Sequence, residues 1–480
     1  MDFTTFLLSS AQPGYASSIQ VIADRWRHFG VVAALDGVDD PTLFPRTLDW
    51  VASQPDQDAQ TLQILEDLSA LSWWRGPEIS DAVARQIGEV SAPIFDRIAA
   101  ALRRDQLSRT TRETARRRHI LMVGALLGPL HSPSRGAVDY AAALCLDPDI
   151  VEIRVCHSND LEPGLQAYIR ARLGPDLAAG RVQFVNIDRR PDFLTAILAH
   201  GGGAFHFWCE RPMSPYVTLL SWLGPTLMFT CGDERPYQYA DVYWYFHSRE
   251  RMAARWLRRG AAPEWAQNYL SSPSGPFFDV EPVVTRARQP SVVTEAEIVV
   301  ATVGNRLGVD MDQAYISGME SFLRSTPEAV WMVVGDLPPP LLSACEQVLG
   351  ERFRHVPYDP DLAGLLTTVD IFSNPFRAGG GASAAIALKC GAVVLTRSIG
   401  DVASLVPEDH LSESSDVYFE HLRQLAQDVR MRDAWRRAQR RQYEIRADQP
   451  QLMQVMRDFV ATAHARYMTR LAADEAATAQ

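Results

Sequence analysis

The feature that most constrains the fold is a repeated alternation of short apolar runs with segments of helical spacing. The first series begins at His119 and has strand-length apolar runs at 119–125, 150–156, 182–187, 204–208 and 226–230. Each run is almost continuously apolar and is followed by a turn or a helical segment. This alternation predicts a parallel sheet that is covered by helices on both faces.

A second series of the same kind follows a segment rich in Ser and Pro. Strands are predicted at 298–303, 330–334, 353–356, 369–373 and 392–396, with helices between them. We therefore expect an α/β protein with two doubly wound, Rossmann-like domains. In such sheets ligands bind at the carboxyl ends of the strands, so a cleft between two facing sheets is the expected site.

The two series divide the chain into five expected regions. Residues 1–117 have apolar residues at helical spacing, and residues 414–480 are helical and charged. Between them lie an N-terminal Rossmann-like domain at 118–270, a linker at 271–296 and a C-terminal Rossmann-like domain at 297–413. The predicted architecture is thus two α/β domains preceded by a mostly α-helical region.

Composition and charge exclude several classes of protein. The net charge of −11 opposes a general electrostatic attraction to nucleic acid or to an anionic membrane. The six cysteines are scattered without a Cys/His cluster, which predicts a reducing compartment and no structural metal. The N-terminus lacks the basic region of a signal peptide, and the longest apolar run is too short to span a bilayer. We expect a cytoplasmic protein without an integral membrane segment.

The segment from Val369 to Val402 has the pattern of an anion-binding turn between a strand and a helix. Three glycines let the backbone take positive φ and let a bulky anion approach, and the helix that follows presents free N–H groups and its positive end. Arg377 supplies a charge that is suited to phosphate. The residues of the turn and of the first helical turn are Gly379, Gly380, Gly381, Ala382 and Ser383.

This second half resembles the C-terminal domain of GT-B-fold glycosyltransferases, which use nucleotide-sugar donors. The matching segments are IVVATVGNRL, WMVVGD, HVPYDPDLAGLLTTVDIFSNPF, the GGGAS turn and CGAVVLTRSIGDV, over about 110 residues. The resemblance implies a GT-B fold and no required cofactor, with a nucleotide-diphosphate sugar as co-substrate. It also implies further donor-binding residues: Arg306 for phosphate, Tyr358 and Leu362 for the base, and Asp401 for the sugar.

Two departures from the family pattern bear on the mechanism. Retaining enzymes of family 4 carry two glutamates around the donor helix, where this chain has Ala378 and Ile386, and no lysine follows Arg306. The pattern is more similar to family 41, which includes O-GlcNAc transferases and bacterial adhesin glucosyltransferases. Those enzymes invert the anomeric carbon and modify protein side chains, so the resemblance implies an inverting, metal-independent transfer.

His131 is the candidate general base, because it lies in the loop after the first strand of the N-terminal α/β domain. An imidazole with an ordinary pKa near 6.5 is suited to deprotonating an acceptor hydroxyl at neutral pH. The alternative is that His131 only caps the junction between loop and helix beside Ser132 and Ser134. Arg135 and Asp233 are candidates for the acceptor side of the cleft, each with an ordinary surface role as its alternative.

The sequence therefore predicts a glycosyltransferase that moves a sugar from a nucleotide-diphosphate sugar, with UDP favoured, to an acceptor protein or glycan. Two alternatives stay open. One is the same fold acting on a polysaccharide or a lipid-linked glycan. The other is a non-catalytic subunit of the same fold, whose helical N-terminal region binds a partner.

Overall fold

The computed structural model describes most of the chain from residue 110 onward. The described residues are 110–124, 126–129, 131–157, 159–186, 202–208, 220–230, 239–258, 263–276, 278, 283–287, 298–377 and 379–478. Residues 1–109 of the expected helical region and Asp233 lie outside them.

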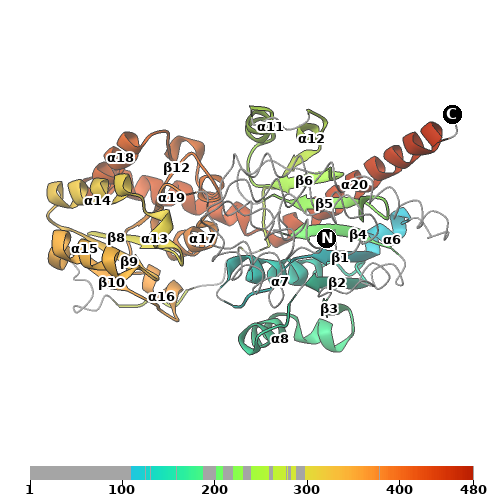
Figure 1. Ribbon diagram of the computed structural model, residues 1–480, viewed down its shortest axis with the longest axis horizontal. Coiled ribbons are helices and arrows are strands. Elements are labelled where there is room, and N and C mark those ends of the chain that lie inside the picture. Colours follow the sequence, from blue (N-terminus) through green and yellow to red (C-terminus); the bar gives the residue numbers. More distant parts are fainter. Residues whose placement is uncertain are drawn as a thin grey trace, which may run out of the picture.

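The described residues form two parallel sheets, which lie side by side along the long axis of the molecule (Figure 1). The sheet of the N-terminal domain has the strand order β3-β2-β1-β4-β5-β6-β7, and the register places Ile120 between Arg154 and Phe205. Its strands are β1 (Arg118–Met122), β2 (Glu152–His157), β3 (Val182–Asn186), β4 (Ala204–Trp208), β5 (Thr226–Phe229), β6 (Val242–Tyr245) and β7 (Tyr269–Ser271).

The sheet of the C-terminal domain has the order β10-β9-β8-β11-β12-β13, again with every pair parallel. In both sheets the order reverses beside the first strand, as in doubly wound folds. The strands are β8 (Ile298–Val303), β9 (Ala329–Val334), β10 (Phe353–Val356), β11 (Ile371–Ser373), β12 (Val393–Arg397) and β13 (Leu411–Ser412).

Helices connect the strands of both sheets. In the N-terminal domain they are α6 (Arg112–Arg117), α7 (Ser132–Leu144), α8 (Pro163–Ala178), α11 (Arg249–Arg258) and α12 (Pro263–Gln267). In the C-terminal domain they are α13 (Leu307–Asp310), α14 (Gln313–Ser325), α15 (Pro339–Leu349), α16 (Leu362–Leu366), α17 (Gly381–Cys390), α18 (Ser415–Gln427), α19 (Val429–Arg446) and α20 (Gln449–Thr478). None of the helices in the described part of the chain combines the length and apolarity that a membrane span requires.

This architecture confirms the predicted α/β class with two Rossmann-like sheets. Each predicted strand of both series overlaps a strand of the structure. The sequence missed β6 and β7, which extend the first sheet, and the short edge strand β13. It also missed α8, which contains Gly174 and Pro175.

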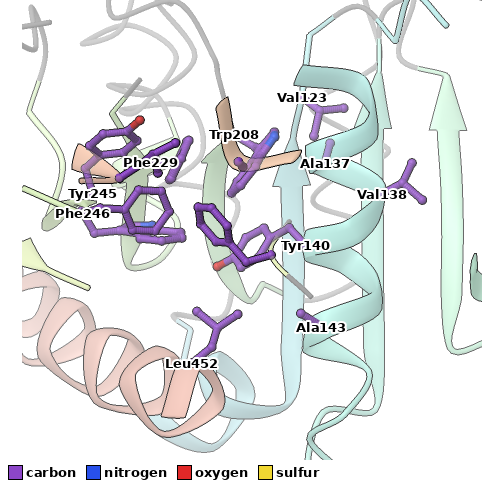
Figure 2. Close-up of a cluster of buried hydrophobic side chains, with 14 of the residues drawn as sticks. Val123, Ala137, Val138, Tyr140, Ala143, Trp208, Phe229, Tyr245, Phe246 and Leu452 are labelled. Carbon is purple, nitrogen blue, oxygen red and sulfur yellow. The ribbon is translucent and has the colours of Figure 1, made fainter. Parts of the chain in front are cut away.

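Aromatic side chains fill the core of the N-terminal domain between its sheet, α7 and α20 (Figure 2). Trp208 on β4 lies between the rings of Phe229 and Tyr140, at centroid distances of 4.1 and 4.9 Å. Figure 2 shows Tyr245 and Phe246 at the other side of this cluster from α7. Large stacked rings leave few alternative packings, so the end of β6 is held rigidly.

Next to this cluster, two buried histidines form a hydrogen-bonded relay, and the partner of each ring nitrogen shows where the protons lie. His119 Nε2 lies 3.2 Å from the carbonyl of Arg116, which only accepts, so this nitrogen carries the proton. His119 Nδ1 then accepts from His206 Nε2 at 2.8 Å, and His206 Nδ1 accepts from the Tyr140 hydroxyl at 2.8 Å. Both rings are therefore neutral, and His206 is a core residue.

We expect acid to destabilise the fold through this relay. Burial lowers the pKa of His119 from 6.5 to about 4, so the unfolded chain takes up the proton first as pH falls. Stability is fully present above pH 6.5 and is lost as pH falls toward 4, by about 3 kcal/mol for this group. Chemical denaturation at a series of pH values measures the loss. The variant His119→Asn, which cannot titrate, should have a shallower dependence; an unchanged slope would contradict this assignment.

The C-terminal helices join the two domains. Helix α20 runs from the C-terminal domain across the N-terminal domain (Figure 1), where Arg457 Nε contacts Asp147 Oδ2 at 2.6 Å. Just before α20, the buried guanidinium of Arg446 donates to carbonyls of both domains, among them Phe246 at 3.0 Å and Ser404 at 2.9 Å. It also bonds the carbonyl of Ser272, so the start of the expected linker is packed against α19.

Candidate functional site

The turn between β11 and α17 is the centre of the candidate site. Gly380 has φ +99° and immediately precedes α17, and a side chain there would lie 2.7 Å from Arg377 and from Asn374. Only glycine satisfies both the backbone angle and the space. At Gly379 an added Cβ would meet nothing within 4 Å, so this side of the turn is open.

The first turn of α17 presents backbone donors without acceptors. The N–H groups of Gly381, Ala382 and Ser383 have no acceptor among the described residues, and no side chain caps the helix. Ala382 is exposed, while the residues on either side of it are half-buried. Free N–H groups and the positive end of a helix favour an anion at this place. These residues therefore have the arrangement that the sequence predicted.

Arg377 is placed differently from the expectation of a direct phosphate contact. Its guanidinium is buried and is bonded within the domain: Nη1 to Asp310 Oδ2 at 2.9 Å, Nε to Asn374 Oδ1 at 3.0 Å and Nη2 to the carbonyl of Val303 at 2.6 Å. These bonds tie the turn after β11 to the end of β8. Arg377 thus stabilises the glycine turn from inside the domain, through bonds to Asn374, Asp310 and Val303.

A buried polar network supports the same turn on the side of the core. The hydroxyl of Ser373, the last residue of β11, lies 2.6 Å from the hydroxyls of both Tyr315 and Tyr418. The Tyr418 hydroxyl lies 3.0 Å from the carbonyl of Asn374. A network of this kind fixes one backbone conformation, because each buried polar atom needs its partner. The turn is therefore preorganised before any ligand binds.

The other expected donor residues lie at the carboxyl edge of the same sheet. Arg306 precedes α13 after β8, with its side chain 43% exposed and Nη2 3.7 Å from Asp310 Oδ1. Tyr358 follows β10 and is 59% exposed. Leu362 begins α16 and is half-buried.

Asp401 lies directly against the first turn of α17. A Cβ placed on Gly381 would be 2.9 Å from Asp401 Cβ and 3.6 Å from Asp401 Oδ2. The carboxylate oxygen Oδ1 accepts a hydrogen bond of 3.0 Å from the hydroxyl of Tyr245, which belongs to the N-terminal domain. A carboxylate is stabilised at this end of a helix.

His131 occupies the cap position of α7, at the carboxyl edge of the first sheet. Its Nδ1 shares a hydrogen bond of 2.8 Å with the Ser134 hydroxyl, and that oxygen also accepts from the N–H of Leu127 at 2.9 Å. Among the described residues no protein group bonds His131 Nε2. Burial lowers the pKa of His131 below 6.5, so the ring is neutral at pH 7.

The structure says less about Arg135 and Asp233, the two candidates for the acceptor side of the cleft. Arg135 is exposed on α7 and lies over the ring of Tyr168 at 5.3 Å, which fits a surface role as well as a binding role. Asp233 lies outside the described residues. Within the described ranges, no group of His, Cys, Asp and Glu residues has an arrangement that could hold a metal ion.

Sequence reasoning missed the residues of β6, of α11 and of the segment between them that reach the C-terminal domain. Arg251 Nη2 donates to the carbonyl of Ser398 at 2.9 Å, and the ring of His247 bonds the backbone of Gly400. With Tyr245 they bind the loop that carries Asp401. The signal in the sequence was the run VYWYFHSRER, an aromatic strand followed by His and Arg at the edge where ligands bind.

Comparison with known proteins shows the fold. No protein-family model and no curated protein matches the sequence. Among solved structures, an O-GlcNAc transferase mutant from Thermobaculum terrenum is similar over 96% of this chain and 100% of its own, with 14% identity and a TM-score of 0.56. HepE from Anabaena in complex with UDP is similar over 72% of this chain and 100% of its own, with 12% identity and a TM-score of 0.52.

A glycosyltransferase from Rickettsia africae has 9% identity and a TM-score of 0.50, over 72% of this chain and 98% of its own. These structures are GT-B proteins, and the described chain has the GT-B fold. The fold that the sequence resemblance implied is therefore confirmed.

Proposed function

We propose that this chain is a glycosyltransferase that takes a sugar from a nucleotide-diphosphate sugar, with UDP as the nucleotide. The observation that carries the proposal is that the N–H groups of Gly381, Ala382 and Ser383, next to the glycine turn, have no acceptor among the residues that the structure describes. The GT-B fold places this helix end at the carboxyl edge of the second sheet. HepE, which shares the fold, was solved with UDP.

In this proposal the diphosphate lies against the first turn of α17. The N–H groups and the exposed guanidinium of Arg306 stabilise the charge that develops on UDP as the glycosidic bond breaks. These donors supply the positive charge for a metal-independent transfer. Arg377 holds the turn in place, Tyr358 and Leu362 contact the base, and Asp401 binds the sugar.

The acceptor is proposed to be a hydroxyl, with a protein side chain as the favoured kind. His131 takes its proton through Nε2, and attack opposite the leaving UDP inverts the anomeric carbon. The structure that is similar over 96% of this chain is an O-GlcNAc transferase, and the resemblance to family 41 implies a protein side chain as the acceptor.

Substitution of the exposed residue Ala382 tests the proposed diphosphate site. Ala382→Glu places a carboxylate beside the free N–H groups, where it favours the helix but repels a diphosphate. We expect wild-type protein to bind UDP by calorimetry, and this variant to bind it roughly 100-fold more weakly, or about 2.7 kcal/mol.

The matched control is Ala382→Gln, which has the same length without the charge and should weaken binding by about tenfold at most. Thermal melting checks that both variants fold. Absence of UDP binding to the wild type, or equal binding by the glutamate variant, would falsify the proposed site.

A further inference from the structure

The loop that carries Asp401 is held by the opposite domain. Three groups from β6, α11 and the segment between them bind it: the Tyr245 hydroxyl at 3.0 Å from Asp401 Oδ1, Arg251 Nη2 at 2.9 Å from the Ser398 carbonyl, and the His247 ring on the backbone of Gly400. The Tyr245 and Asp401 side chains are 156 positions apart in the sequence. The conformation of this loop therefore depends on the N-terminal domain.

On its other side, Asp401 touches the proposed diphosphate site. Its Cβ lies against Gly381, with no room for a larger residue there. One carboxylate oxygen, Oδ1, is directed to Tyr245, and Oδ2 lies nearer the first turn of α17. The carboxylate thus stands between a donor from one domain and the helix end of the other.

Tyr245 is itself fixed. It is 4% exposed, with its ring 5.2 Å from Phe229 and 4.7 Å from Phe246. Figure 2 shows its hydroxyl at the edge of the aromatic cluster rather than inside it. A rigid ring with its hydroxyl at the edge is a suitable device for orienting a partner, since little entropy is lost when the bond forms.

We infer that Tyr245 is a positioning residue that orients Asp401 to bind the sugar of the donor. Its hydroxyl fixes the orientation of the Asp401 carboxylate beside the first turn of α17, where a sugar hydroxyl next to the diphosphate can donate to it. The class of donor that fits is a neutral hexose with free hydroxyls, because a uronic acid would place a second carboxylate against Asp401. The inference rests on the proposed function, and it makes the N-terminal domain a determinant of sugar preference.

The test compares UDP with UDP-sugars on the full chain by calorimetry. The ligands are UDP, UDP-glucose, UDP-N-acetylglucosamine and UDP-glucuronic acid. We expect the wild type to prefer a neutral UDP-hexose over UDP-glucuronic acid. In Tyr245→Phe the Kd of UDP should change less than twofold, while the Kd of the preferred UDP-hexose rises about tenfold, as for one bond to a charged group.

Tyr243→Phe is the matched control, because it removes a buried hydroxyl from the same strand. That hydroxyl accepts from the N–H of Ala240 and lies within the N-terminal domain. This variant should bind every ligand as the wild type does. Since both substitutions keep the ring, a general loss of packing would affect the two alike.

A double-mutant cycle with Asp401→Asn separates positioning from a structural role. If Tyr245 acts through Asp401, Tyr245→Phe should change UDP-hexose binding by less than twofold in the Asp401→Asn background. Full additivity, a preference for UDP-glucuronic acid, or equal weakening of UDP and UDP-hexose would overturn the inference while leaving the function standing. A wild type that binds no UDP would instead remove the proposed function itself.

Discussion

Replacement of His131 by alanine is expected to lower kcat by about 10²–10⁴-fold, which is the usual contribution of a general base. The affinity for UDP should stay within twofold of the wild type, because His131 belongs to the opposite domain from the proposed diphosphate site. Transfer to a hydroxyl acceptor, measured at saturating donor, gives kcat, and calorimetry gives the affinity. A His131→Ala variant with wild-type turnover would exclude this residue as the base.

The pH dependence of the same reaction has a defined direction. Burial lowers the pKa of His131 below 6.5, so the neutral ring that can accept a proton is present above that pH. Activity should therefore be constant near pH 7 and fall on the acidic side, with its midpoint below pH 6.5. A midpoint above pH 7 would indicate a different base.

Ser134 decides which nitrogen of His131 is the base. For Nε2 to accept the proton of the substrate, Nδ1 must carry its own proton and donate it to the Ser134 oxygen at 2.8 Å. That oxygen can accept this bond together with the one from Leu127, since a hydroxyl has two lone pairs. Ser134→Ala should lower kcat about tenfold through loss of one hydrogen bond, and Ser132→Ala on the same helix turn should not.

The stereochemistry of the product tests the same mechanism independently. A base that activates the acceptor opposite the leaving UDP gives inversion in one displacement. The anomeric configuration of the product glycoside, read by NMR, should therefore be opposite to that of the donor. Retention would remove His131 from the role of acceptor base, whatever its effect on the rate.

The sequence predicted those parts of the fold that local patterns determine. Near-continuous apolar runs marked β4 and β8 to the residue, because a strand buried on both faces is largely apolar. The glycine turn was also predicted from a local pattern, and Gly380 has the positive φ that this pattern required. In contrast, β7 has only three residues, and α8 includes Gly174 and Pro175, so neither has a clear period.

The parts that the sequence could not predict are contacts between distant residues. Arg377 looked like a phosphate ligand because its partner Asp310 lies 67 positions earlier and nothing local connects them. The bond from Tyr245 to Asp401 spans 156 positions and two domains. Charge and spacing identify which residues are suited to an anion, but the side chain that neutralises or orients them is set by tertiary packing.

Replacement of Asp310 by alanine is expected to destabilise the protein by about 3–5 kcal/mol, the usual cost of breaking a buried ion pair from one side. The side chains of Asp310 and Arg377 are 9% and 7% exposed, and their charged atoms are 2.9 Å apart. Without Asp310, the guanidinium stays buried and keeps only neutral acceptors at Asn374 and Val303. Urea denaturation, analysed for the C-terminal domain, measures the loss.

Two further variants give this prediction its controls. Asp312→Ala, two residues along the chain, removes the N-cap of α14 and should cost only about 1 kcal/mol. The double variant Asp310→Ala with Arg377→Met removes both charges and should recover most of the stability, because a buried ion pair is often no better than an apolar pair. If Arg377 only braces the glycine turn, this double variant should also keep UDP affinity within about tenfold, or 1.4 kcal/mol. A larger loss of UDP affinity in a stably folded double variant would show that Arg377 contributes more to binding than this bracing.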